Sequence, residues 1–309
     1  MRSDSADFIP AGAHEKIAAA LLRFTARVTW RPALSPRVSF ARQRWWMRQL
    51  ARFTRPHAGI DRQAGVEGGV PGEWMRPGGT AARRATILYL HGGGYCIGSH
   101  KTHRAVTSHL AAAAGLAVFA ADYRLAPEHP FPAALDDAVA CFQSLRQAGP
   151  VIIAGDSAGA GLALAAALAA RQRQIAAPAA LLLFSPWIDL SSAAIPDGAP
   201  RDVMLRADWL RACADHYLAG QPATTPLAAP LRDDLAGLPP TLIQAGSDEL
   251  LCGQALRTHD ALRAAGCDVH CEIIPNRWHA FQLVAGSLPS ADAAVARAGQ
   301  FARNATPPP

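Results

Sequence analysis

Lysine is almost absent from this chain of 309 residues, because Lys16 and Lys101 are the only two and all other basic side chains except histidine are arginines. The formal net charge is +6. A positive balance can mark a nucleic-acid-binding surface, but no nucleic-acid-binding motif accompanies it here. We therefore attribute the arginine bias to background composition and expect no nucleic-acid partner.

Long hydrophobic runs are also absent. No stretch reaches the roughly 18 consecutive apolar residues that a membrane-spanning helix needs. The N-terminus does not resemble a secretory signal, because Asp4, Asp7 and Glu15 precede an apolar run, 17–22, that is too short. We expect a cytoplasmic protein with no stable membrane insertion.

The six cysteines are scattered and do not have the spacing of a small disulfide-linked scaffold. Cys267, His270 and Cys271 are close enough in sequence to suggest a metal cluster. Residues 269–274 predict a strand, however, and neighbouring strand residues such as His270 and Cys271 point to opposite faces. We expect free thiols, a reducing compartment and no metal ion.

Half of the residues are apolar, so the chain can form a large core. Short apolar strands alternate with helical segments, which predicts a mostly parallel central sheet covered by helices on both faces. The predicted strands are 86–90, 117–121, 151–154, 180–184, 241–245 and 269–274, and helices are predicted at 105–114, 133–147 and 252–265.

The segment 14–55 predicts two helices broken near Pro32 and Pro36, with apolar residues at helical spacing at Ile17, Leu21, Phe24 and Val28. From Arg23 to Arg55 there are nine arginines and no acidic residue. A membrane-surface helix is one interpretation, encouraged by Trp45 and Trp46. We favour the other, an amphipathic lid with solvated arginines and with tryptophans that face a pocket.

Two further segments interrupt the alternation. Residues 59–77 predict an antiparallel hairpin that turns at Gly68 and Gly69. Residues 191–238 predict no strand and one helix, 207–218, which favours an insertion over the edge of the sheet. The expected organisation is a cap from 1–55 and 196–230 on a core from 56–195 and 231–309.

The segment from Val151 to Gly159 has the form of a nucleophile elbow, in which a strand runs into a sharp turn and then into a helix. Ser157 lies at the apex of this turn, at the N-terminus of the helix. Gly155 and Gly159 occupy positions where a side chain would collide with the packed strand and helix. Ser157 is therefore the candidate nucleophile.

A serine nucleophile needs a base and a group that orients the base. Asp248 follows one predicted strand and His279 follows the next, so both are expected at the edge of the sheet where Ser157 lies. Glu249 is the alternative acid, but it is expected to point elsewhere if Asp248 faces the site. Asp156 is expected to brace the elbow by hydrogen bonds.

Three consecutive glycines, Gly92 to Gly94, follow the predicted strand 86–90. They allow backbone N–H groups to approach a ligand without side chains in the way. We expect the N–H groups of Gly92, Gly93 and Ala158 to form an oxyanion hole, in which each donor contributes about 10²–10³ in rate.

The ordered motifs of residues 60–285 resemble the hormone-sensitive-lipase-like family of α/β-hydrolases, in particular its bacterial esterases with Gly-Asp-Ser-Ala-Gly. They are His91-Gly-Gly-Gly94, Tyr123-Arg-Leu-Ala-Pro-Glu128 with Phe131-Pro-Ala-Ala134, Gly155-Asp-Ser-Ala-Gly159, Ser185-Pro-Trp187 and the pair Asp248 and His279. The family usually has Asp-Pro-Leu at its acid and further acids downstream, whereas this chain has Asp248-Glu-Leu.

The resemblance implies an α/β-hydrolase fold with a helical cap, and a serine carboxylesterase that needs no metal or cofactor. It places Ser157, Asp248 and His279 in the catalytic triad, and gives Tyr123, Arg124 and Glu128 a framework role. It also implies short- to medium-chain esters as substrates, cleaved through an acyl-enzyme, and a homodimer paired through 269–274.

Two other functions stay open: a lactone or amide hydrolase with the same triad, and a non-catalytic small-molecule receptor. We predict a substrate pocket with walls at Tyr95, Trp187 and Phe281, and further candidates at Trp45, Trp46, Met204 and Trp209.

Overall fold

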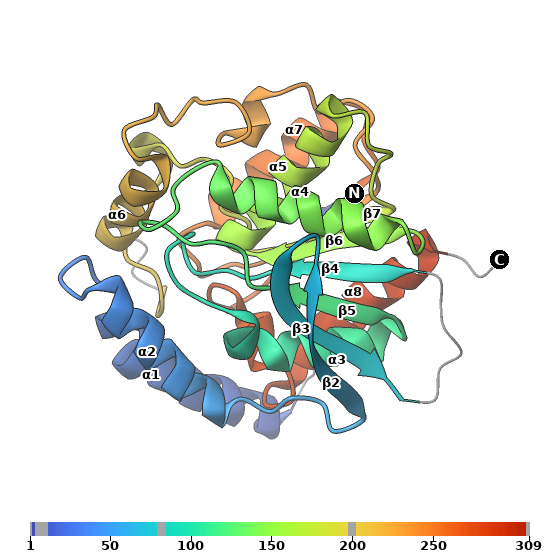
Figure 1. The fold of residues 1–309 in the computed structure, drawn as a ribbon. Coiled ribbons are helices and arrows are strands. Elements are labelled where there is room, and N and C mark those ends of the chain that lie inside the picture. The colour runs from blue at the N-terminus through green and yellow to red at the C-terminus, as the bar shows by residue number, and fades with distance from the viewer. Residues whose placement is uncertain (1, 4–11, 79–84, 197–201, 307–309) are drawn as a thin grey trace.

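A twisted β-sheet runs through the middle of the molecule (Figure 1). The computed structural model describes residues 2–3, 12–78, 85–196 and 202–306. Within these ranges the sheet has nine strands in the order β1-β9-β8-β7-β6-β4-β5-β3-β2. The strands are β1 (Arg2–Ser3), β2 (Ile60–Glu67), β3 (Val70–Pro77), β4 (Thr86–Leu90), β5 (Ala117–Ala121), β6 (Val151–Asp156), β7 (Ala180–Phe184), β8 (Thr241–Gly246) and β9 (Val269–Ile274).

Only the hairpin breaks the parallel arrangement of these strands, because β2 is antiparallel to β3 and β3 is antiparallel to β5. The hairpin turns at Gly68 and Gly69, as predicted. All six strands predicted from the alternation are present, and only β6 and β8 extend further, to Asp156 and Gly246. The predicted fold class is confirmed.

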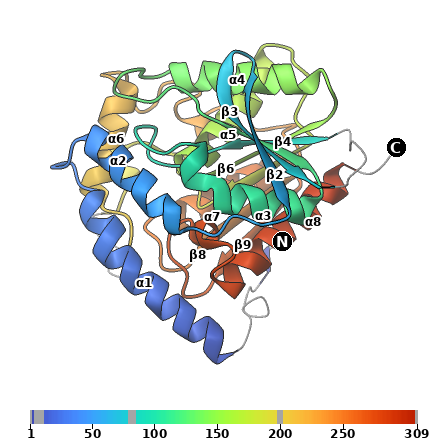
Figure 2. The same ribbon diagram turned by 60° about the horizontal axis from the view of Figure 1, so that its bottom comes forward.

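Helices cover both faces of the sheet (Figures 1 and 2). Along β4, Leu88 and Leu90 join the core under α4 (Ala133–Arg146), α5 (Ala158–Gln172) and α7 (Cys252–Ala264). Ile87 and Tyr89 face the other side, where α3 (Arg104–Ala114) and α8 (Pro289–Ala305) pack. Burial of both faces explains why these strands are almost continuously apolar in sequence.

Three more helices lie together to one side of the sheet: α1 (Ala13–Ala33), α2 (Phe40–Leu50) and α6 (Ala207–Leu218) (Figure 1). The indole nitrogen of Trp209 on α6 donates to Oε1 of Gln43 on α2 at 2.9 Å. Trp46 on α2 donates to the carbonyl of Thr29 on α1 at 3.0 Å. The N-terminal helices and the inserted helix therefore form one covering layer.

The apolar residues at helical spacing on α1 lie on its exposed face. Ile17 and Leu21 are 67% and 63% exposed, and Phe24 and Val28 are 63% and 51% exposed. The tryptophans of α2 are also at the surface, since Trp45 and Trp46 are 54% and 37% exposed. The prediction that these two tryptophans face a pocket is wrong, because α2 turns Met47 and Gln43 inward instead.

The outer edge of β9 is partly occupied, because β1 pairs with it in parallel at Cys271 and Glu272. On β9, Cys271 is buried and His270 is exposed, so the two side chains face opposite sides of the sheet, as predicted. None of the helices in the described ranges is long and apolar enough to cross a membrane.

A buried ion pair connects α1 to the core. The guanidinium of Arg277, in the loop after β9, pairs with the carboxylate of Glu15, and both side chains are almost fully buried. The same carboxylate accepts the backbone N–H of Ser290 at 3.1 Å. Removing one partner of a buried pair leaves the other charge without compensation, which costs more than the pair itself contributes.

We predict that Glu15→Ala lowers the free energy of unfolding by about 3–5 kcal/mol, because the Arg277 charge stays buried without its carboxylate. Urea denaturation followed by circular dichroism measures this change. A loss below about 1 kcal/mol would contradict the role of the ion pair as the anchor of α1.

Candidate active site

Ser157 lies in a strained turn between β6 and α5. Its φ and ψ angles are 54° and −120°, and a non-glycine residue in so rarely populated a conformation costs about 1–3 kcal/mol. Two hydrogen bonds hold the turn. The N–H of Ser157 donates to the carbonyl of Phe184 at 2.8 Å, and the carbonyl of Ser157 accepts the N–H of Trp187 at 3.0 Å. The predicted elbow is therefore present.

The two glycines of the elbow are needed for close packing. A Cβ atom at Gly155 would collide with the carbonyls of Gly159 and Leu90, and one at Gly159 would collide with those of Leu90 and His91. The backbone of α5 thus touches the end of β4, which brings the loop after β4 next to Ser157. The sequence prediction for these two glycines is confirmed.

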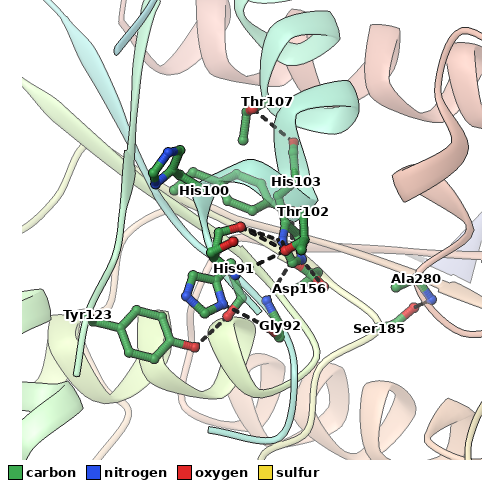
Figure 3. A network of polar contacts seen from close by, with 12 residues as sticks. His91, Gly92, His100, Thr102, His103, Thr107, Tyr123, Asp156, Ser185 and Ala280 are labelled. Atoms are coloured by element: carbon green, nitrogen blue, oxygen red, sulfur yellow. Dashed lines mark hydrogen bonds and ion pairs between the residues drawn. The ribbon is translucent and has the colours of Figure 1, made fainter. Parts of the chain in front are cut away.

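His279 lies in the loop after β9, and its Nδ1 is 3.2 Å from Oε2 of Glu249, which follows β8. The two side chains are 3% and 0% exposed. The next residue, Ala280, donates its backbone N–H to Oγ of Ser185 at 3.0 Å, which fixes the loop (Figure 3). The structure therefore provides a buried carboxylate that orients the imidazole.

Asp248 has different partners from those predicted. Its carboxylate accepts a hydrogen bond from Nη2 of Arg23 on α1 at 2.6 Å and another from Oγ of Ser247 at 3.0 Å. The prediction that Asp248 orients His279 is wrong, because the tight turn after β8 directs consecutive side chains to different sides. Glu249, the alternative acid, contacts Nδ1 of His279 instead.

The pKa of His279 results from opposed effects. Burial lowers the pKa of the imidazole, because the charged form loses its hydration. The hydrogen bond and charge of Glu249, followed by the charges of Asp202 and Asp156, act in the other direction. They outweigh burial, so the pKa of His279 lies above its usual value of 6.5.

Asp156 connects the elbow to the glycine loop (Figure 3). Its Oδ1 accepts the backbone N–H of Gly92 at 3.0 Å and the hydroxyl of Tyr89 at 2.9 Å, and lies 3.2 Å from Nε2 of His103. Burial raises the pKa of Asp156, but the charge and hydrogen bond of His103 outweigh this and lower it. Asp156 braces the site, as predicted.

This contact changes the predicted oxyanion hole. The N–H of Gly92 is directed at Asp156, so the prediction that it faces the substrate is wrong. No hydrogen-bond partner is found among the described residues for the backbone N–H groups of Gly93, Gly94 and Ala158. Ala158 begins α5, where the first N–H groups of a helix have no partner within it.

One predicted framework residue, Tyr123, supports the same loop, whereas Arg124 ties the chain to α4. The hydroxyl of Tyr123 donates to the carbonyl of His91 at 2.5 Å, and the two rings stack with centroids 4.3 Å apart. Arg124 binds Asp137 with both its Nε and Nη2 atoms. Burial, followed by the nearby His103, lowers the pKa of His91 to about 4, which keeps it neutral at physiological pH.

A cavity of about 40 Å³ lies between this site and the covering helices. Ser157 and His279 both line it, together with Gly93 and His103. The remaining wall is largely apolar and comes from both parts of the covering layer: Trp30, Leu34, Met47, Met204, Leu205 and Trp209, with Ile97 and Leu283 from the core.

The predicted walls at Tyr95, Trp187 and Phe281 are wrong, because these side chains are buried in the core and do not line this cavity. Tyr95 stacks on Tyr217 with ring centroids 3.8 Å apart. Met204 and Trp209, named as further candidates, do line the cavity.

Sequence reasoning weighed Glu249 but preferred Asp248 as the acid, and it did not identify His103. The order of serine, acid and histidine along the chain fits both Asp248 and Glu249, so only the direction of each side chain separates them. His103 gave no local signal, because its role depends on the packing of α3 against the elbow. Among the described residues no group of three or more histidine, cysteine and acidic side chains is arranged to hold a metal ion.

Comparison with known proteins agrees with this geometry. The sequence model of the alpha/beta hydrolase fold family matches residues 87–283. The chain is 45% identical over 240 residues to an acetyl-hydrolase of Streptomyces hygroscopicus, covering 76% of this chain and 80% of that protein. It is 38% identical over 242 residues to an esterase of Acinetobacter venetianus, covering 76% and 79%.

A crystal structure of an esterase from the bacterial hormone-sensitive lipase family superposes on this structure with a TM-score of 0.87. The two sequences are 35% identical, and the match covers 97% of this chain and 100% of the other. The chain therefore belongs to the α/β-hydrolase fold and, within it, to the bacterial hormone-sensitive-lipase family.

Proposed function

We propose that this protein is a serine carboxylesterase that cleaves short- to medium-chain carboxylic esters through an acyl-enzyme. The observation that carries the proposal is that Ser157, in its strained turn, and His279, oriented by a buried Glu249, line the same cavity. Relatives named acetyl-hydrolase and esterase support the same reaction class.

In the first half of the reaction, Oγ of Ser157 attacks the ester carbonyl while Nε2 of His279 takes the hydroxyl proton. The carboxylate of Glu249 keeps the other ring nitrogen protonated and stabilises the imidazolium. His279 then protonates the leaving alcohol. In the second half, a water molecule activated by His279 attacks the acyl-enzyme and releases the acid.

The tetrahedral oxygen would be held by the N–H groups of Gly93 and Ala158, with that of Gly94 next to them. Donors placed before the reaction begins stabilise the charge that develops on this oxygen. Asp156 contributes indirectly, because it fixes Gly92 and thereby the position of the following N–H groups. The helix N-terminus at Ala158 adds a favourable dipole.

The size of the cavity favours small acyl groups. A second cavity of about 70 Å³ lies under α1 and shares Trp30, Met204 and Leu283 with the first. Met204 therefore lies between the space around Ser157 and further room for a longer chain. We expect acetyl to butyryl esters to fit the first cavity and longer chains to need the second.

Three further assignments are part of this proposal. The chain is divided into a cap, 1–55 and 196–230, and a core, 56–195 and 231–309. The protein is cytoplasmic, because all six cysteines are free thiols, as expected in a reducing compartment. A homodimer would pair through the part of β9 that β1 leaves uncovered.

We predict that Ser157→Ala lowers kcat for p-nitrophenyl acetate by about 10⁴–10⁶-fold, because no nucleophile remains. Unchanged circular dichroism would show that the variant is folded. Turnover within tenfold of the wild type would rule out Ser157 as the nucleophile.

We predict that kcat/KM falls on the acid side as His279 is protonated, with a midpoint above the reference pKa of about 6.5. Glu249→Gln removes the largest of the interactions that raise the pKa of His279, so the midpoint should move to lower pH, and the rate should fall by about 10³–10⁴-fold. Asp248→Asn is the matched control and should leave the midpoint in place. If Asp248→Asn moves the midpoint and lowers the rate more than Glu249→Gln does, then Asp248 is the acid.

We predict that Met204→Ala raises kcat/KM for p-nitrophenyl hexanoate relative to acetate by about tenfold, because it joins the two cavities. Met47→Ala, which widens only the first cavity, is the control and should change the ratio less. An unchanged ratio in Met204→Ala would show that the acyl chain lies elsewhere.

A further inference from the structure

The outer face of α1 is an apolar stripe that no other described element covers. Its residues are Ile17, Leu21, Phe24 and Val28, all more than half exposed. Steps of four, three and four residues place side chains on one side of a helix. A single exposed apolar residue is ordinary, but a continuous stripe of four large ones marks an interaction surface.

The exposed stripe is present although α1 also has a buried side. The opposite side of α1 carries Leu22, Ala26 and Trp30, which pack against the core near Met204 and Trp278. Both sides of α1 are therefore apolar, one against the protein and one against solvent. Figure 2 shows α1 at the margin of the molecule, with one long side away from the sheet.

Two tryptophans extend the stripe onto α2. Trp46 donates its indole N–H to the carbonyl of Thr29, beside Val28, and its ring lies 6.1 Å from that of Trp45. We call the four stripe residues and these two tryptophans the outer cap surface. Tryptophan is enriched where proteins meet the interface between lipid and water, because one part of its ring is apolar and the other donates a hydrogen bond.

The charges on α1 and α2 indicate what kind of partner would bind the outer cap surface. No acidic residue occurs between Lys16 and Asp61. Six arginines in this interval are exposed, and none of them forms an ion pair with another described residue: Arg27, Arg37, Arg42, Arg48, Arg52 and Arg55. A large apolar stripe bordered by arginines and free of carboxylates complements a surface that is both apolar and negatively charged.

We propose that the outer cap surface docks onto an anionic lipid bilayer. The stripe and tryptophans enter the interface between headgroups and acyl chains, and the arginines contact the lipid phosphates and carboxylates. A second copy of this chain is a poorer partner, because a two-fold interface through this face would bring the two sets of arginines together.

The position of the surface gives docking a consequence for the site. The inner side of α1 lines the cavity of about 70 Å³ that adjoins the one around Ser157. A bilayer on the outer side would therefore lie one helix thickness from that cavity. The docking proposal itself requires only the exposed groups and does not depend on the esterase reaction.

The test is cosedimentation of the full chain with vesicles made of equal parts phosphatidylcholine and phosphatidylserine, and with vesicles of phosphatidylcholine alone. We expect binding to the mixed vesicles and little to the neutral ones. Binding should weaken as salt rises from about 0.05 to 0.5 M, because salt screens the arginine contacts. No binding of the wild type to mixed vesicles at low salt would overturn the proposal.

Vesicle binding by variants tests whether the outer cap surface is the part of the protein that contacts the lipid. The double variant Leu21→Glu with Phe24→Glu should bind mixed vesicles at least tenfold more weakly, because it adds two carboxylates and removes two apolar groups. Arg27→Gln with Arg42→Gln should weaken binding and flatten its salt dependence. Val66→Glu and Arg62→Gln, at exposed positions on β2, are the matched controls and should bind like the wild type.

All variants should hydrolyse a soluble short ester like the wild type, since none of these residues lines the cavity around Ser157. If Leu21→Glu with Phe24→Glu fails to fold, quenching of Trp45 and Trp46 by brominated lipid in the wild type replaces it. Lack of quenching, or undiminished binding by the folded double variant, would contradict the proposal. A dimer that this variant dissociates, without vesicle binding, would assign the surface to a second copy.

Discussion

The strained backbone of Ser157 is the constraint on which the rest of the site depends. This conformation persists only where the surrounding packing leaves the residue no alternative. Here β6 and α5 approach so closely that only glycine fits at Gly155 and Gly159. The same approach exposes the N-terminus of α5 at the apex and brings the end of β4 beside it, so Ser157, the helix dipole and the glycine loop are positioned together.

A buried charge network extends this constraint to the neighbouring loops. Asp156, one residue before Ser157, accepts the N–H of Gly92 and pairs with His103, which ties the glycine loop and the start of α3 to the elbow. Glu249 makes the equivalent contact with His279 on the other side. Both carboxylates are almost fully buried. In such an environment charges interact more strongly than in water, and an unpaired charge is costly. Groups aligned in this way would need little rearrangement during the proposed reaction.

The sequence was sufficient to predict the sheet, its covering helices, the elbow, and the edge where serine, acid and histidine meet, because strand and turn signals are local. It was not sufficient where the outcome depends on which way a side chain or N–H group points, or on which side of a helix is buried. Asp248 and Glu249 differ only in which way a tight turn points them, and the N–H of Gly92 is occupied by a carboxylate 64 residues away. The helical spacing on α1 identified an apolar face, but α1 has two apolar sides, and spacing does not tell which one is buried. Tyr95 comes directly after the three glycines and Trp187 lies in the Ser185-Pro-Trp187 motif, yet both rings are buried in the core.

Ser157 activated by His279 is the central claim, and a covalent inhibitor tests it most directly. Organophosphates phosphorylate a serine hydroxyl much faster when a neighbouring base removes its proton and nearby N–H donors hold the phosphoryl oxygen. After treatment with paraoxon, peptide mass spectrometry is predicted to find one diethylphosphoryl group, on Ser157, with a parallel loss of ester hydrolysis. His279→Ala should abolish the labelling. Full inhibition with the group on another residue, or continued hydrolysis by the protein labelled at Ser157, would contradict the account.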